Sequence, residues 1–250
     1  MISAPIIEIA TWIWIGVAVV TFISLVTLKI RAPYGRHTRQ GWGMMIDNHW
    51  GWFWMELPAL VVFPLIAILG SAEKTSLHWI LIALWIIHYT NRTLIFPFRL
   101  KTKGKKMPIS IVYSATFFNV INGGLNGYAM GYMELPTVPT AAFVIGVSIF
   151  IIGFYINQRA DNHLIGLRKK QSGYSLPEGW LFNRISCPNL FGEIIEWTGF
   201  AIAACSLQAF SFAIWTFANL VPRAMNHHDW YRETFENYPD QRKAVIPYIL

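Results

Sequence analysis

Long apolar stretches separated by short polar segments recur along the whole chain of 250 residues. A helix that crosses a bilayer needs about 20 predominantly apolar residues. Seven stretches approach or reach that length, at 6–28, 50–70, 77–97, 109–130, 140–157, 190–206 and 208–222. The last two come from one long run that divides at 206–208. The pattern predicts an all-α integral membrane protein with seven transmembrane helices in one multi-pass domain over 1–250.

The basic residues lie on one side of this arrangement. Eighteen of the twenty Lys and Arg residues fall in the segments 29–49, 98–108 and 158–189 and in the tail after 222. Because positively charged loops stay in the cytosol, we expect the N-terminus outside and the C-terminus in the cytosol. The net charge of +7 is then an orientation signal, and no nucleic-acid partner is expected. A bacterial inner membrane and an endoplasmic reticulum membrane fit equally well, with the active face cytosolic.

Composition supports the membrane class. Apolar residues make up 54% of the chain and charged residues 13%, whereas soluble domains carry roughly 25% charged residues. A soluble domain of this length could not bury so much apolar surface, so soluble and disordered proteins are excluded. Cys187 and Cys205 have neither a metal spacing nor a redox spacing. His227 and His228 are adjacent and project differently on a helix, so no metal is expected.

Ionisable groups inside apolar spans are costly and are functional candidates by default. Glu56 follows the aromatic run 52–54 and precedes Pro58. Burial there would favour the neutral acid, which can donate a hydrogen bond; the alternative is a carboxylate that reaches the cytosolic interface. Tyr89 and Arg92 are three residues apart and share a helix face. For both of them, a position at the membrane surface is the alternative.

Two polar stripes follow helical spacing. The first is Asn119, Asn122 and Asn126, where the amides are equally consistent with interhelical hydrogen bonds and with the wall of a polar cavity. Gly123 and Gly127 beside them have the small-xxx-small spacing of closely packed helices.

The second stripe is Asn189, Glu193 and Glu196, at i, i+4 and i+7. Two carboxylates cannot face lipid, so they must face protein, an arginine or a bound polar ligand. This stripe is the strongest physical sign of a binding site in the sequence.

Several motifs resemble those of the steroid 5α-reductase family. They are Leu-Phe-Gly-Glu-Ile-Ile-Glu-Trp-Thr-Gly at 190–199, Arg-Ala-Met-Asn-His-His-Asp-Trp-Tyr at 223–231, Phe-Glu-Asn-Tyr-Pro at 235–239 and Arg-Lys-Ala-Val-Ile-Pro at 242–247. Shorter matches at 32–37, 56–58 and 88–89 precede them in order. The resemblance implies a membrane-embedded reductase that uses NADPH to saturate the 4,5 double bond of a 3-oxo-Δ4-steroid taken from the bilayer.

The resemblance also implies roles for individual residues. Glu56 and Tyr89 match the catalytic pair that binds the 3-keto oxygen of the steroid, and Trp52, Trp215 and Asn219 would line the steroid pocket. The residues expected around the cofactor are Asn157, Asp161, Arg168, Tyr174, Asn189, Glu193, His227 and Tyr231, with Arg36, Arg92, Lys103 and Lys105 from the basic segments.

Other functions stay open on the residues alone. The nearest alternative is a reductase on the same scaffold that acts on an enoyl thioester or a polyprenal. A non-enzymatic membrane transporter or lipid-binding protein and a membrane methyltransferase with a similar polar tail are more remote. Binding of NADPH separates a reductase from a transporter. The natural steroid, 5α against 5β delivery and the oligomeric state are not determined by these residues.

Overall fold

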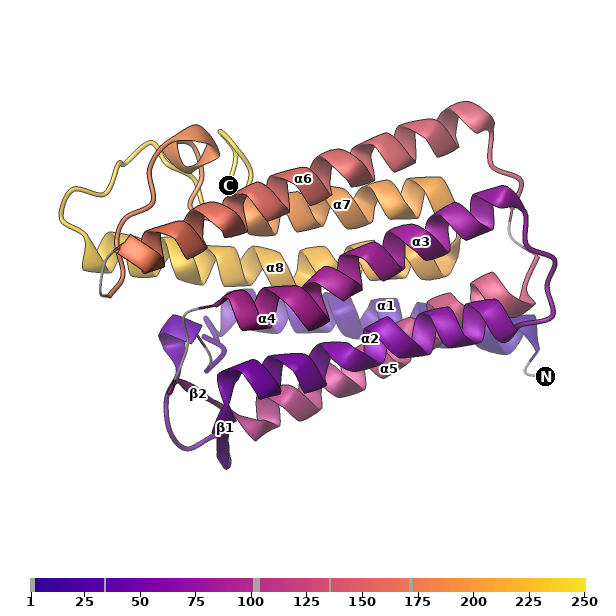
Figure 1. The fold of residues 1–250 in the computed structure, drawn as a ribbon, viewed down its shortest axis with the longest axis horizontal. Helices are drawn as coiled ribbons and strands as arrows, with labels where there is room; N and C mark the ends of the chain where they lie inside the picture. Colours follow the sequence, from indigo (N-terminus) through magenta and orange to yellow (C-terminus); the bar gives the residue numbers. More distant parts are fainter. Residues whose placement is uncertain (1–2, 34, 101–103, 135, 171–172) are drawn as a thin grey trace. The chain divides into compact units, whose positions relative to one another are not determined.

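The computed structural model describes residues 3–33, 35–100, 104–134, 136–170 and 173–250. Helices make up most of this part of the chain (Figure 1). The chain divides into two compact units. The first unit consists of Met1–Trp12, Ala32–Pro139 and Ala204–Ala209, and the second of Ile13–Arg31, Thr140–Ala203 and Phe210–Leu250. The long N-terminal helix α1 (Ala4–Thr27) therefore contributes to both units.

The first unit is built on the helices α2 (Asn48–Leu69), α3 (Ser76–Thr90), α4 (Phe96–Arg99) and α5 (Ile109–Tyr132). Strands β1 (Met45–Asp47) and β2 (Lys106–Pro108) pair antiparallel, with Met45 opposite Pro108. A short 3-10 helix covers Gly35–His37. The Asp47 carboxylate accepts hydrogen bonds from the backbone N–H groups of His49 and Trp50, which caps the start of α2. The paired strands thus fix where α2 and α5 begin.

Helices α2 and α5 lie side by side and pack through glycines (Figure 1). A Cβ atom on Gly127 would lie 2.9 Å from the Phe63 carbonyl oxygen, and one on Gly131 would overlap the carbonyl oxygen of Ile66. The backbones can approach this closely only where side chains are absent. The close packing expected from the glycines is therefore confirmed at Gly127, whereas a Cβ atom on Gly123 would come no nearer than 3.4 Å to a neighbouring atom.

The second unit contains α6 (Thr140–Lys170), α7 (Pro188–Ala204), most of α8 (Leu207–Thr234) and the 3-10 helix Trp180–Asn183. Helices α6 and α7 also pack through glycines. A Cβ atom on Gly153 would overlap the backbone nitrogen of Glu196, and one on Gly192 would overlap that of Asn157. Gly146 on α6 and Gly199 on α7 lie seven residues from Gly153 and Gly192, and each also approaches the backbone of the facing helix closely. Sequence analysis did not identify this glycine contact.

Each of the seven apolar stretches contains a helix, but the helices and the stretches differ in length. Helices α6 and α8 continue to Lys170 and Thr234, past the ends of their stretches at 157 and 222. A helix needs apolar residues only where it is buried or in lipid, so hydropathy marks the apolar part alone. The division between the last two stretches is confirmed, because α7 ends at Ala204 and Cys205 adopts a φ of 47°.

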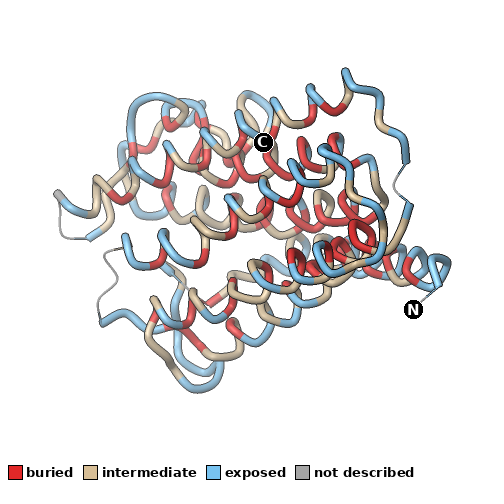
Figure 2. Tube along the Cα trace, turned by 45° about the vertical axis from the view of Figure 1, so that its right-hand side comes forward, coloured by how far each residue is buried: buried red, intermediate tan, exposed pale blue. Residues whose placement is uncertain are grey.

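Four of the described helical segments are long and apolar enough to cross a membrane: Ala4–Thr27, Asn48–Leu69, Ser76–Arg99 and Thr140–Lys169. Large apolar side chains stay exposed on them, among them Ile13, Leu65 and Ile151. Figure 2 shows buried and exposed positions interleaved along the helices. Such an apolar surface is typical of helices that face lipid. The chain is therefore a multi-pass membrane protein, which is the coarser part of the seven-span prediction.

Candidate active site

Glu56 is the buried acid of the first unit, with 9% of its surface exposed. Its Oε1 atom lies 3.4 Å from Arg92 Nε, and its Oε2 atom lies 3.4 Å from Asn119 Nδ2. Asn119 also donates a 2.7 Å hydrogen bond to the Met55 carbonyl, which fixes the amide between α2 and α5. Both carboxylate oxygens thus face nitrogen donors from other elements of the unit.

Arg92 lies in a segment of π-helix, Asn91–Ile95, between α3 and α4. Pro97 explains the wider turn, because its ring nitrogen cannot donate and its ring displaces the carbonyl four residues earlier. The Phe96 N–H accordingly bonds to the Asn91 carbonyl, five residues back. The Arg92 guanidinium lies over the rings of Trp52, at 4.9 Å, and Phe96, at 5.6 Å. The structure therefore groups Arg92 with Glu56 and Trp52, two of the residues expected at the substrate.

Tyr89 lies on the last turn of α3 and is 4% exposed. Its ring centroid lies 5.1 Å from that of Trp85 and 4.9 Å from that of His88. Trp85 is itself fixed, because its indole N–H donates to the Ala59 carbonyl and its ring stacks on Phe63 at 4.1 Å. The phenol is therefore carried by a rigid aromatic group.

The indole N–H of Trp52 is a further hydrogen-bond donor, and the Trp52 ring contacts Arg92. Its indole N–H is buried and has no hydrogen-bond partner among the residues that the structure describes. A buried donor without a partner is costly, so such a group is suited to an oxygen atom of a ligand.

The second unit holds an amide and carboxylate cluster. Asn157 of α6 donates to the Asn189 carbonyl at 3.0 Å, and Asn189 Nδ2 donates to Asp161 Oδ1 at 3.0 Å. Glu193 follows Asn189 by one turn of α7 and is 9% exposed. The close contact of α6 and α7 at their glycines brings these side chains together.

Arg168, Tyr174 and Tyr231 form a second group in the same unit. The Arg168 guanidinium lies 5.5 Å from the Tyr174 ring, and the Tyr174 and Trp230 rings meet edge to face at 5.2 Å. Tyr231 is 3% exposed and stacks in parallel on Tyr238 at 6.1 Å. His227 lies on α8, one turn before Tyr231.

The chemistry of these groups fits a nicotinamide dinucleotide. Carboxylate oxygens such as those of Asp161 and Glu193 accept hydrogen bonds from ribose hydroxyls and from a carboxamide, as do the oxygens of side-chain amides. A guanidinium such as that of Arg168 binds phosphate oxygens. The residues present are therefore sufficient in kind for NADPH.

The remaining expected residues fall in both units. Trp215 and Asn219 belong to the second unit, where the Trp215 N–H donates to the Trp14 carbonyl at 3.0 Å and Asn219 donates to the Trp215 carbonyl at 3.1 Å. Arg36 is half-buried and Lys105 is exposed, both in the first unit. Lys103 lies outside the described residues.

Sequence reasoning missed a buried polar group formed by Ser186, His228 and Tyr238. Ser186 Oγ lies 2.7 Å from His228 Nδ1 and 2.5 Å from the Tyr238 hydroxyl. No spacing in the sequence indicated it, because the three residues come from separate segments. His228 was considered only as a metal ligand.

These observations define a multi-pass helical membrane protein that holds buried ionisable side chains in both of its units. The family model for 3-oxo-5-alpha-steroid 4-dehydrogenase matches residues 105–250. The chain belongs to this family and is an oxidoreductase, as its motifs predicted.

Similar proteins cover nearly the whole chain. The steroid 5-alpha-reductase DET2 of Gossypium hirsutum is 40% identical over 242 residues, which cover 93% of each chain. The 3-oxo-5-alpha-steroid 4-dehydrogenase 1 of Bos taurus is 38% identical over 244 residues, which cover 91% of this chain and 92% of that protein. The protein of that name from Rattus norvegicus is 37% identical over 243 residues.

Proposed function

We propose that this protein reduces the 4,5 double bond of a 3-oxo-Δ4-steroid to the 5α-dihydrosteroid with NADPH. One observation carries the assignment to the substrate: Glu56, buried between Arg92 and Asn119, lies in an apolar aromatic group with Trp52. An apolar site with few polar groups is what a steroid with one ketone requires. The names of the similar proteins support the same substrate class.

Glu56 and Tyr89 are the proposed donors to the 3-keto oxygen. Reduction of an enone at its β-carbon places negative charge on the carbonyl oxygen. A carboxylic acid and a phenol aimed at that oxygen stabilise the charge in a site that excludes water. Arg92 Nε lies 3.4 Å from Glu56 Oε1 and helps to fix the orientation of the Glu56 side chain.

The cofactor-side residues are proposed on α6, α7 and α8. When bound, NADPH supplies the hydride. Asn157, Asp161, Asn189 and Glu193 would bind its ribose and amide groups, and Arg168 its phosphates. Tyr174, His227 and Tyr231 would complete this group in the second unit.

We place these residues on the cytosolic side of a seven-span protein, since eighteen of the twenty basic residues fall in the segments that this topology puts there. The steroid would enter from the bilayer, in which it dissolves, and the water-soluble cofactor from the cytosol. A bacterial inner membrane and the endoplasmic reticulum are both consistent with this orientation.

The direct test measures NADPH oxidation by purified protein in detergent, with and without testosterone, and identifies the product. We expect steroid-dependent oxidation and a 5α-dihydro product. Glu56→Gln and Tyr89→Phe should each lower kcat by about 10²-fold, as does the loss of one oxyanion donor. Tyr113→Phe, at an exposed position of α5, is the matched control. An unchanged kcat in Glu56→Gln would remove Glu56 from the mechanism.

A further inference from the structure

Ser186, His228 and Tyr238 join three segments of the second unit through one hydrogen-bond cluster. Ser186 precedes α7, His228 lies in α8, and Tyr238 lies in the C-terminal segment after α8. The Tyr238 hydroxyl lies 3.0 Å from His228 Nδ1, and Ser186 Oγ donates to the Lys243 carbonyl at 3.0 Å. Ser186 and Tyr238 are 3% and 9% exposed, so water competes little for these bonds.

The protons of this cluster can be assigned. The Ser186 hydroxyl donates to the Lys243 carbonyl, so its oxygen is free to accept from Tyr238. Burial raises the pKa of the Tyr238 phenol, which therefore remains a donor at neutral pH. Burial also lowers the pKa of His228, and the neutral imidazole with its proton on Nδ1 donates to Ser186 Oγ at 2.7 Å. Ser186 Oγ is thus the shared acceptor of the cluster, and Tyr238 and His228 are its two donors.

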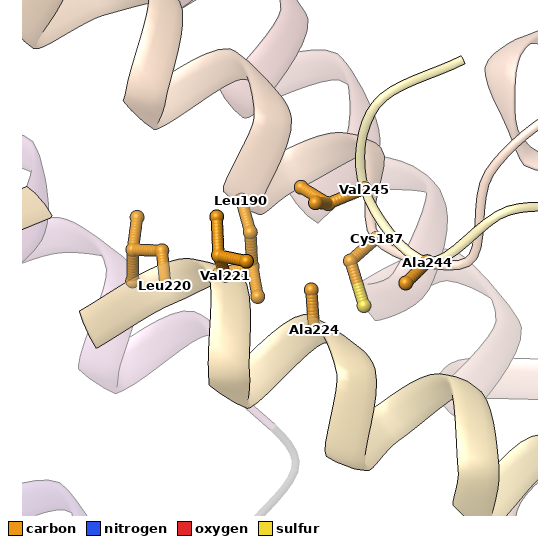
Figure 3. Packing of buried hydrophobic residues seen from close by; sticks show 7 residues of the cluster. All are labelled: Cys187, Leu190, Leu220, Val221, Ala224, Ala244 and Val245. Atoms are coloured by element: carbon orange, nitrogen blue, oxygen red, sulfur yellow. The ribbon is translucent and has the colours of Figure 1, made fainter. Parts of the chain in front are cut away.

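The C-terminal segment is docked beside the cluster by backbone and apolar contacts. Ile185 and Lys243 form a parallel bridge, and the Ser186 N–H donates to the Lys243 carbonyl at 2.8 Å. Figure 3 shows the adjoining apolar cluster, in which Ala244 and Val245 pack with residues of α7 and α8. Its members are Cys187, Leu190, Leu220, Val221, Ala224, Ala244 and Val245. The C-terminal segment therefore has apolar and backbone contacts with this unit besides the hydrogen bonds of the polar cluster.

The polar cluster contacts one of the residues proposed to bind the cofactor and lies close in sequence to two others. Tyr238 stacks on Tyr231 with an interplanar angle of 10°. His228 directly follows His227 on α8, and Ser186 lies three residues before Asn189. A shift of the Tyr238 ring would therefore reach Tyr231 through the stack, and a shift of α8 at His228 would move His227.

We propose that Ser186, His228 and Tyr238 are positioning residues that hold Tyr231, His227 and Asn189 in their binding geometry for the dinucleotide. The inference rests on the proposed function, since it assumes that those three residues face NADPH. The cluster touches no reacting atom. We expect its contribution to be to cofactor affinity.

The test compares Tyr238→Phe with Tyr248→Phe. Phenylalanine at 238 keeps the ring that stacks on Tyr231 and removes only the hydroxyl that donates to Ser186. Tyr248 lies in the same segment, is 73% exposed and carries a cation–π contact with Arg184 that phenylalanine retains. Two measurements are made on purified protein: the NADPH dissociation constant, by titration, and amide hydrogen exchange of residues 226–250 without cofactor.

We expect Tyr238→Phe to raise the NADPH dissociation constant about 5-fold, the effect of one lost hydrogen bond. Exchange in 226–232 should become faster, while the KM for steroid and the kcat at saturating NADPH stay unchanged. Tyr248→Phe should match the wild type in every respect. His228→Asn should weaken NADPH binding by a similar factor, and the effect of the double variant should be smaller than the product of the two single effects, because both changes remove a donor to the same Ser186 oxygen.

Three outcomes would overturn the proposal in distinguishable ways. If Tyr238→Phe is folded and binds NADPH as the wild type does, the cluster has only a structural role. If exchange rises in 235–250 alone, the cluster holds the tail and does not position α8. If the wild type binds no NADPH at all, the positioning role is lost together with the proposed cofactor site.

Discussion

The two units hold their buried polar side chains in different ways. In the first unit a single acidic side chain, Glu56, lies against the guanidinium of Arg92, which aromatic rings of α2 and α4 contact. In the second unit, amides and a carboxylate of α6 and α7 share one group of hydrogen bonds, and Ser186, His228 and Tyr238 share another. A single acidic group in an apolar site suits a small polar group of a ligand, whereas several hydrogen-bonded partners suit a ligand with many polar atoms. The contrast matches the two proposed ligands.

Both units depend on glycines for the close approach of two helices, and substitution of such a glycine gives the largest expected effect on stability. In Gly153→Ala, the added methyl group would overlap the backbone of Glu196 and separate α6 from α7. Overpacking of this kind costs about 1–3 kcal/mol. We expect the thermal midpoint in detergent to fall by several degrees and the NADPH dissociation constant to rise about 10-fold, because Asn157 and Asn189 move apart.

Gly166→Ala is the matched control on the same helix. A Cβ atom at Gly166 would meet no atom within 4 Å, and alanine favours the helix. Equal behaviour of the two variants would show that the close contact of α6 and α7 does not determine the cofactor site.

Arg92→Lys and Glu193→Ala should affect different kinetic parameters, which tests the assignment of one ligand to each group. Lysine keeps the charge of Arg92 but loses the planar contacts with Trp52 and Phe96, so we expect kcat to fall about 10-fold with little change in the KM for NADPH.

Glu193→Ala should raise the KM for NADPH about 10-fold with a smaller effect on kcat. Arg39→Lys, at an exposed site, serves as the control. If Arg92→Lys changes only the KM for NADPH, Arg92 belongs with the cofactor, as the family resemblance implied.

The smallest expected effect is a pH dependence of stability that comes from His228. Burial lowers the pKa of His228. Three cations also lower this pKa, whereas one anion raises it; the cations are Arg232, Arg242 and Lys243, and the anion is Asp229. His228 therefore binds a proton more readily in the unfolded chain than in the folded one. Its contribution to the free energy of unfolding is complete above pH 6.5 and is lost as the pH falls through the lower pKa of the folded state.

The measurement is the thermal midpoint at pH 7.5 and pH 5.0 in the wild type and in His228→Asn, which cannot titrate. We expect the midpoint to fall by about 2 °C more in the wild type, consistent with one partly buried imidazole in a chain of this size. The same fall in both proteins would assign the pH dependence to other groups.

Particular residues show how far the sequence predicted the site. Glu56 was found because an acid inside an apolar stretch is rare, and Asn189 and Glu193 because their helical spacing puts them on one face. The pairing of Glu56 with Arg92 was not found, since it depends on the π-helical turn before Pro97 and on the packing of α2 against neighbouring elements. The same limit applies to Ser186, His228 and Tyr238, which lie in three segments without a common periodicity.

The sequence by itself determined the class of protein, the helical stretches and the family, because hydropathy, charge distribution and local motifs are properties of short segments. Only the tertiary structure decided which polar side chains become partners, where α6 and α8 end and which glycines allow two helices to touch. These features depend on contacts between residues far apart in the chain, and burial alters the strength of every charge and hydrogen bond among them. The local pattern selects the candidate residues, and the packing decides which of them act together.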